Sequence, residues 1–161
     1  MGGSFLKKWI RYLLIVAVIP LLGIEGFGGE DIGTLEPVQV LVVTQENDGI
    51  HVLTDGGQEG NGKDVTAALE NLTKTASSKV FLDTTEYLLL EPGTEKWLSQ
   101  FKQSLRPSCM VCYVLGSVDL QAAAQYLQLH PVSVNLIQYE AGKQQLLTLI
   151  YNEGRMTLVR S

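Results

Sequence analysis

The pattern of hydrophobic positions divides the chain into an apolar leader and a longer region of strand-like and helix-like segments. Residues 12–24 are thirteen consecutive uncharged and almost wholly apolar positions, and they follow Lys7, Lys8 and Arg11. A basic start, an apolar run and an acidic far side are typical of an exported chain whose N-terminus stays inside the cell. The run fits a secretory signal and is shorter than the roughly twenty residues of a spanning helix.

We expect residues 1–28 to act as a membrane anchor, because an interfacial tryptophan and a snorkelling arginine can extend the span. The predicted anchor residues are Trp9, Arg11, Leu13, Leu14, Val16, Leu21 and Leu22. Cleavage is the alternative, although Gly26-Phe27-Gly28 is the only passable site and lacks the Ala-x-Ala pattern. The pattern favours a single-pass cell-membrane protein with a cytoplasmic N-terminus and an extracytoplasmic domain, which is secreted if the leader is cleaved.

Residues 38–161 are predicted to form one domain, joined to the leader by a Gly-rich and acidic linker at 29–37. Short apolar or alternating runs predict strands, and apolar positions every three or four residues predict helices. Asn47-Asp48-Gly49 and Asn152-Glu153-Gly154 predict hairpins, because these residue types tolerate positive φ. The strands are predicted at 38–44, 50–53, 80–90, 109–115, 132–138, 145–151 and 155–159, and the helices at 65–76, 95–105 and 119–129.

This order of elements predicts an α/β fold, with α+β as the variant, in which about three helices cover a mixed β-sheet. Gly56–Gly62 is predicted as a flexible loop, and Thr94 as an N-cap. Residues 29–161 carry nine Lys and Arg against sixteen Asp and Glu, a net charge of −7. Such a domain lacks the positive charge that nucleic acid binding requires, and anionic lipid headgroups repel it. Only the leader is therefore expected to touch lipid.

The Gly-rich segment offers the sharpest candidate motif. Gly57, Gly62 and Lys63 fit the phosphate-binding pattern G-x-x-x-x-G-K, but Asp64 stands where a Ser or Thr would hold Mg²⁺. Glu59 adds a second negative charge, so we expect neither a nucleotide nor another cofactor. A flexible loop that starts a helix is the simpler interpretation. The speculative ligand-binding residues are Gly57, Gly60, Gly62 and Lys63.

Cysteine and histidine residues are interpreted as structural. Cys109 and Cys112 are spaced C-x-x-C, but they lie inside an apparent strand, where positions i and i+3 point to opposite faces. Reactive cysteines of this spacing instead lie at a helix N-terminus, which lowers the thiol pKa. A zinc site would need two further ligands, for which only His51 and His130 are available as imidazoles. We therefore predict core cysteines, with an occasional disulfide as the alternative, and no metal site.

Two carboxylates interrupt the apolar segment 80–90. Asp83 and Glu86 flank two threonines there. The simpler interpretation is an edge, a bulge or a bend in the strand. The alternative is a carboxylate site of an enzyme, which requires both groups to converge in a buried pocket.

The segment from Ile32 to about Pro131 resembles the N-terminal domain of the Ger(x)C family, the C subunits of spore germinant receptors. The similar stretches are 31–35, 38–44, 47–49, 60–72, 80–91, 109–115 and 119–129. Family members are usually lipoproteins and more than twice this length, whereas this chain has no lipobox Cys, and Asp83 and Thr84 stand where the family tends to have a His. The resemblance implies a membrane-anchored relative of one domain, with no catalytic residues to transfer.

The leading hypothesis is a non-enzymatic extracytoplasmic interaction domain that binds a membrane or envelope protein, in spore germination or spore envelope assembly. One alternative is a small exported enzyme that uses Asp83 and Glu86. The other is a small-ligand binding module that uses the Gly56–Lys63 loop.

Overall fold

The computed structural model describes residues 35–47, 49–132, 134–140, 145–152 and 154–160. The predicted leader, with its anchor residues from Trp9 to Leu22, lies outside the described residues. Within the described ranges, no helix is both long enough and apolar enough to span a membrane.

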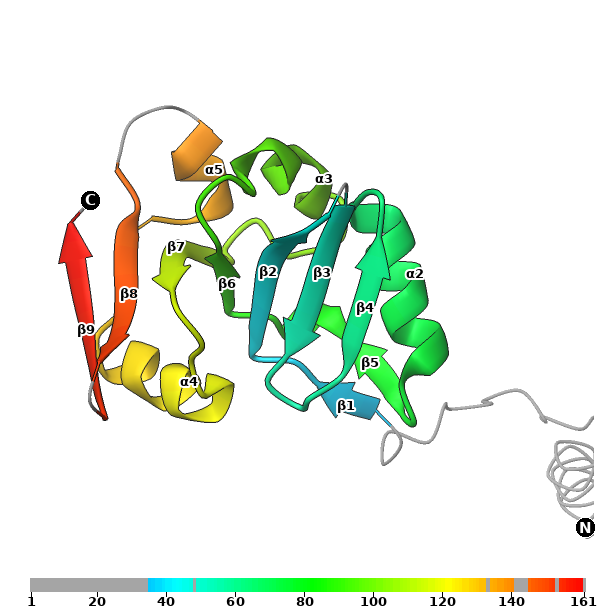
Figure 1. Cartoon of the computed structure of the whole chain (residues 1–161), viewed down its shortest axis with the longest axis horizontal. Helices are drawn as coiled ribbons and strands as arrows, with labels where there is room; N and C mark the ends of the chain where they lie inside the picture. The colour runs from blue at the N-terminus through cyan, green and yellow to red at the C-terminus, as the bar shows by residue number, and fades with distance from the viewer. Residues whose placement is uncertain (1–34, 48, 133, 141–144, 153, 161) are drawn as a thin grey trace, which may run out of the picture. The chain divides into compact units, whose positions relative to one another are not determined.

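Seven strands form one mixed sheet in the spatial order β4-β3-β2-β6-β7-β8-β9 (Figure 1). The strands are β2 (Val40–Glu46), β3 (Gly49–Thr54), β4 (Glu59–Gly62), β6 (Tyr87–Leu90), β7 (Met110–Leu115), β8 (Leu147–Asn152) and β9 (Arg155–Arg160). The central strands β2, β6, β7 and β8 are parallel neighbours, and antiparallel strands extend the sheet at both ends. The predicted mixed sheet and both predicted hairpins are therefore confirmed.

Helices lie on both faces of the sheet and cover two separate apolar layers. The helices are α2 (Val65–Thr75), α3 (Leu98–Phe101), α4 (Leu120–Leu129) and α5 (Leu136–Glu140). Side chains alternate along β2, so Leu41 and Val43 pack with α2, α3 and α5, while Val40 and Val42 pack with α4. The Tyr87 hydroxyl donates to the Leu127 carbonyl at 3.2 Å and links α4 to the sheet.

Side-chain caps fix where the two longer helices begin. Asp64 Oδ1 accepts the Ala67 N–H at 2.9 Å at the start of α2, and Asp119 caps α4 in the same manner. His130 ends α4, where its Nδ1 lies 3.1 Å from the Tyr126 carbonyl and its ring stacks on Tyr126. These caps confirm the predicted limits of α4 within a residue.

The structure corrects the prediction of a flexible loop over 56–62. Only the turn at Gly56–Gln58 is irregular, and Glu59–Gly62 form β4, which pairs with β3. The sequence did not predict this strand because two of its four residues are glycines, which lower strand propensity. The predicted linker also contains a short strand, since β1 (Leu35–Pro37) pairs in parallel with β5 (Lys79–Phe81).

Two further elements differ from their predicted form. The segment predicted as one strand over 80–90 consists of β5 and β6, separated by the 3₁₀ turn η2 (Leu82–Thr84), as the predicted bend requires. The predicted strand over 132–138 is wrong, because only Asn135 forms a bridge, to Met110, before α5 begins.

The predicted helix over 95–105 is shorter than expected. It consists of the 3₁₀ turn η3 (Glu95–Trp97) followed by the single turn of α3. Thr94 does not cap it, because the Thr94 hydroxyl donates to the Glu91 carbonyl at 2.7 Å instead.

Candidate functional site

The four residues predicted to bind a ligand lie along β4 and at both of its ends. Gly57 is in the β3–β4 turn, Gly60 and Gly62 are in β4, and Lys63 follows that strand. Gly57 has a φ of 81°, which suits the turn. The structure therefore separates Gly57 from Lys63 by the length of a strand, and the four residues do not surround one pocket.

Gly60 and Gly62 allow β4 to pack against α2. A Cβ atom at Gly60 would lie 2.3 Å from the Ala68 carbonyl oxygen, and one at Gly62 would lie 2.3 Å from the Ala68 amide nitrogen. Real side chains do not tolerate such contacts, so these positions require glycine for helix–strand packing. The glycines that resemble a phosphate loop thus have a structural role in holding the edge of the sheet.

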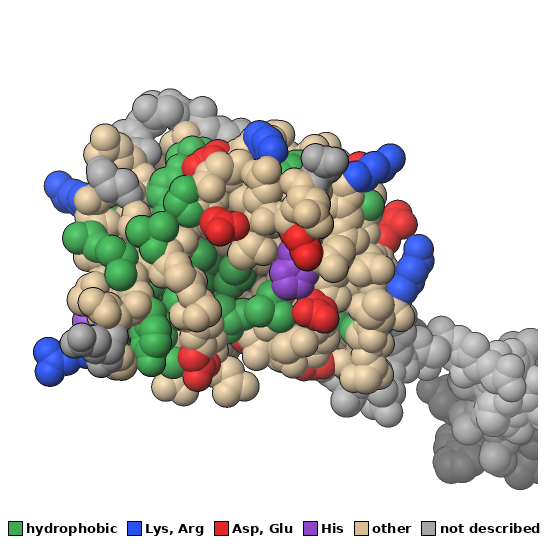
Figure 2. Space-filling view, in the orientation of Figure 1, with side chains coloured by type: hydrophobic (Ala, Val, Ile, Leu, Met, Phe, Trp, Pro, Cys, Tyr) green, Lys and Arg blue, Asp and Glu red, His purple; other side chains and the backbone are tan. Residues whose placement is uncertain are grey.

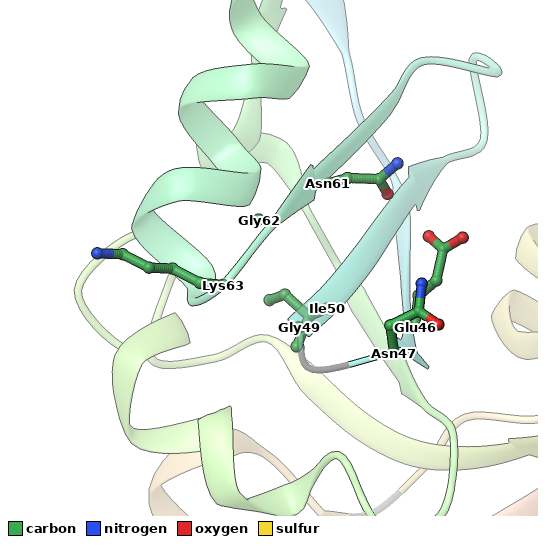
Figure 3. A pocket seen from close by; sticks show the side chains of 7 residues that line it. All are labelled: Glu46, Asn47, Gly49, Ile50, Asn61, Gly62 and Lys63. Carbon is green, nitrogen blue, oxygen red and sulfur yellow. The ribbon is translucent and has the colours of Figure 1, made fainter.

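Two open pockets flank β4. The first, about 410 Å³, is lined by Glu46, Asn47, Gly49, Ile50, Asn61, Gly62 and Lys63. Figure 3 shows the Lys63 side chain pointing away from those of Glu46, Asn47 and Asn61, so the only cation among the described lining residues does not face the carboxylate. The second, about 320 Å³, includes Gly57 and Glu59 at the other end of the strand. Neither pocket gathers positive charge.

His51 lies in a polar network that the sequence did not predict. Its Nε2 is 3.4 Å from Glu59 Oε2, and its Nδ1 is 3.4 Å from Thr44 Oγ1. The three residues come from β3, β4 and β2, and the Glu59 side chain is 71% exposed. A contact with a carboxylate so exposed contributes little to stability. The sequence does not predict this network, because it does not predict β4, the strand that brings Glu59 beside His51.

The two cysteines are free and buried, as predicted. Cys109 packs on the α2 face of the sheet and Cys112 on the α4 face. Burial raises the pKa of each thiol to about 12. Both thiols are therefore protonated at neutral pH, which disfavours nucleophilic chemistry.

Asp83 and Glu86 do not form the buried pair that the enzyme alternative requires. Both side chains are exposed; Asp83 lies within η2, and Glu86 directly precedes β6. Among the described residues, no group of three or more His, Cys, Asp or Glu side chains is placed to hold a metal ion.

The most strongly perturbed phenol lies on the opposite side of the sheet from His51. Burial, together with hydrogen bonds to Glu95 and Tyr139, raises the pKa of Tyr113. The Tyr113 bond in turn helps to lower the pKa of Glu95 against the opposing effect of burial. Glu95, Tyr113 and Tyr139 belong to η3, β7 and α5, so we interpret their hydrogen bonds as holding the two short helical elements against the sheet.

Exposed apolar side chains gather in the C-terminal half of the domain. Five of the six large exposed hydrophobic residues in the described part of the chain belong to β7, α4, α5, β8 and β9: Leu115, Leu129, Ile137, Tyr151 and Val159. Figure 2 shows hydrophobic side chains mostly over β8, β9 and α4, whereas a histidine with carboxylates around it lies toward β2–β4. The two halves of this face thus differ in chemistry.

Comparisons with protein-family models, with curated proteins and with solved structures each find no match to this chain.

Proposed function

We propose that this chain is a membrane-tethered interaction domain without enzymatic activity, whose partner is another membrane or envelope protein. The observation that carries the proposal is the concentration of exposed apolar side chains on the β7–β9 half of the domain. Apolar surface of this kind marks protein interaction sites, because exposing it to water is unfavourable. The leader pattern of residues 1–28 supports the tether, and the net charge of −7 beyond it supports a domain that stays off anionic lipid.

The resemblance to the N-terminal domain of the Ger(x)C family supports a setting for this function. In that setting the partner belongs to a spore germination or spore envelope assembly. The resemblance rests on the order of strands, the Gly-rich segment and α2, and it carries over no catalytic residue.

Photo-crosslinking in intact cells tests the proposal. A photoreactive amino acid is placed at Leu129 or Tyr151, which lie on the α4 face and are 78% and 43% exposed, and a matched probe is placed at Glu70, which is exposed on α2. We expect the first two probes to capture one membrane or envelope protein that the Glu70 probe does not capture. Equal capture from all three positions, or recovery of the chain in the soluble fraction with its leader intact, contradicts the proposal.

A further inference from the structure

The strand β9 is an open edge of the sheet. It pairs with β8 on one side, and no described residue pairs with its other side (Figure 1). It is six residues long and contains no proline. An unpaired strand of this kind presents a row of free N–H and C=O groups, and natural proteins usually block such a row.

The register of the β8–β9 hairpin identifies which backbone groups are free. Asn152 pairs with Arg155 across a two-residue turn, in which Gly154 has a φ of 79°. Residues that flank a two-residue turn exchange hydrogen bonds, and the bonding direction then alternates along the strand. The N–H and C=O groups of Met156, Leu158 and Arg160 therefore point away from β8.

The side chains of β9 suit a strand with neighbours on both sides. Met156 and Leu158 are half-buried in the apolar layer that includes α4, and Val159, on the other face, is 43% exposed. The face with Val159 also carries Arg155 and Thr157, so β9 has an apolar face toward α4 and a mixed face opposite it. Neither Arg155 nor Arg160 forms an ion pair with another described residue.

The opposite edge of the sheet is blocked. The Asn61 N–H of β4 donates to Asn71 Oδ1 at 3.0 Å. The Thr75 hydroxyl of α2 lies 3.1 Å from the Glu59 carbonyl oxygen and shares its proton between that oxygen and the Asn71 carbonyl at 3.0 Å. Helix α2 thus places Asn71 and Thr75 against the Asn61 N–H and the Glu59 C=O, two of the outward groups of β4. An antiparallel pairing of one edge with the same edge of a second copy is two-fold symmetric, so it closes as a pair and does not continue as a filament.

We propose that the open edge is occupied by β9 of a second copy of this chain, in an antiparallel pairing that joins two sheets into one. The outward groups pair when Leu158 faces Leu158, Met156 faces Arg160, and Thr157 faces Val159. In this register apolar residues meet at the centre, and no arginine lies directly opposite another arginine. The strand is therefore complementary to itself.

A cysteine at the centre of the pairing tests the register. The proposal places the two Leu158 Cα atoms about 5.5 Å apart, within disulfide range. We expect the full-length Leu158→Cys chain, purified in mild detergent, to form a disulfide-linked dimer on mild oxidation. The matched control is Asn61→Cys on the blocked edge, which we expect to stay monomeric on a non-reducing gel. The native cysteines do not interfere, since both are buried.

Charged substitutions on the exposed face of β9 test the pairing without placing a charge in the core. Thr157 and Val159 are exposed on one face of β9. The variant T157K/V159K opposes lysines in its own dimer, and T157E/V159E opposes glutamates, so each should dimerise roughly tenfold more weakly than the native chain. Mixing the two variants pairs lysine with glutamate and should restore a dimer by light scattering.

Three results overturn the proposal. The first is a native chain that stays monomeric. The second is a dimer that neither variant weakens. The third is a Leu158→Cys chain that crosslinks no faster than Asn61→Cys. The purified chain contains no other protein, so these outcomes are independent of the photo-crosslinking test of the proposed function.

Discussion

The two edges of the sheet differ in how the outward backbone N–H and C=O groups of the edge strand are satisfied. At the β4 edge, two glycines let α2 approach so closely that Asn71 and Thr75 bond to the outward backbone of the strand. At the β9 edge no described residue occupies the outward groups, and Met156 and Leu158 form an apolar face opposite the mixed face of Thr157 and Val159. One edge is thus closed within the chain, and the other is suited to a second strand. The difference indicates which of these two edges is free to associate, and two-fold pairing of that edge stops at two copies.

The largest expected effect comes from destroying the closed edge. Gly60→Ala places a Cβ 2.3 Å from the Ala68 carbonyl oxygen and should destabilise the fold by about 3 kcal/mol, because β4 and α2 must separate. Gly57→Ala is the matched control: its φ of 81° is unfavourable for alanine, but nothing lies within 4 Å, so about 1 kcal/mol is expected. Urea unfolding measures both. Equal losses would show that β4 does not depend on this close packing.

A proline pair compares the two sides of β9. The N–H of Val159 points toward β8, so Val159→Pro removes a ladder hydrogen bond and should cost about 2 kcal/mol of unfolding free energy. The N–H of Arg160 points outward, so Arg160→Pro should cost less than about 1 kcal/mol in the monomer while weakening the dimer. Unfolding and light scattering on the same samples separate the two effects. The reverse order of stabilities would refute the assigned register.

Opening the closed edge should have a smaller effect on stability and a visible effect on assembly. The double variant N71A/T75A removes both hydrogen bonds from α2 to β4 and should cost about 1 kcal/mol in total, since the sites are exposed. It also frees a second edge, so species larger than a dimer should appear in light scattering. Thr73→Ala removes a hydroxyl of the same helix that bonds only within α2, and it should leave the dimer unchanged.

The smallest effect near neutral pH concerns the buried thiols at the centre of the sheet. Burial raises the pKa of Cys109 and Cys112 from an ordinary value of 9.0 to about 12. A group whose folded pKa is raised stabilises the fold fully below its unfolded value, and this contribution is lost as the pH rises toward the folded value. Stability should therefore be insensitive to the thiols at pH 7 and fall above about pH 9. A double Cys→Ser variant that shows the same alkaline loss would assign it to other groups.

Thiol labelling distinguishes the two edges further. Because both cysteines are buried, a thiol reagent reaches them only when the domain opens. Gly60→Ala should accelerate labelling in proportion to its loss of stability. T157K/V159K alters only the exposed side of β9, so it should leave the labelling rate close to that of the native chain at concentrations where both are monomeric.

The sequence predicts the interior of this fold better than its margins. The sequence predicts β2, β7, α2 and α4 because these elements are buried on at least one face. Burial selects apolar residues, so it is visible in the apolar runs of the strands and the periodicity of the helices. The sequence does not predict β4, because glycine has a low strand propensity. Gly60 and Gly62 are required by their close contact with Ala68 of α2, which only the tertiary structure reveals. The apolar residues Val132 and Val134 predict a strand over Val132–Gln138. Both are buried in the core, but the only β-bridge described in this segment is the one from Asn135 to Met110.

The candidate chemistry was limited by the same missing strand. The opposite faces of Cys109 and Cys112 follow from strand alternation alone, so the sequence predicts them. The contact of His51 with Glu59 requires β4 to pair with β3, and the hydrogen bond from Asn61 to Asn71 requires β4 to lie against α2. The sequence does not predict β4, so it predicts neither contact. Asp64, which breaks the phosphate-loop pattern, proves to be the N-cap of α2.

Amide hydrogen exchange at the two edges tests the central claim most directly. The Asn61 N–H, bonded to Asn71, should be protected in every sample, because its partner belongs to the same chain. At a concentration between the dimer dissociation constants of the two chains, the Leu158 N–H should be protected in the native protein and exchange faster in T157K/V159K. Rapid exchange of Leu158 in the native protein at dimer-forming concentrations, or equal protection in the variant, would contradict an edge closed by a second copy.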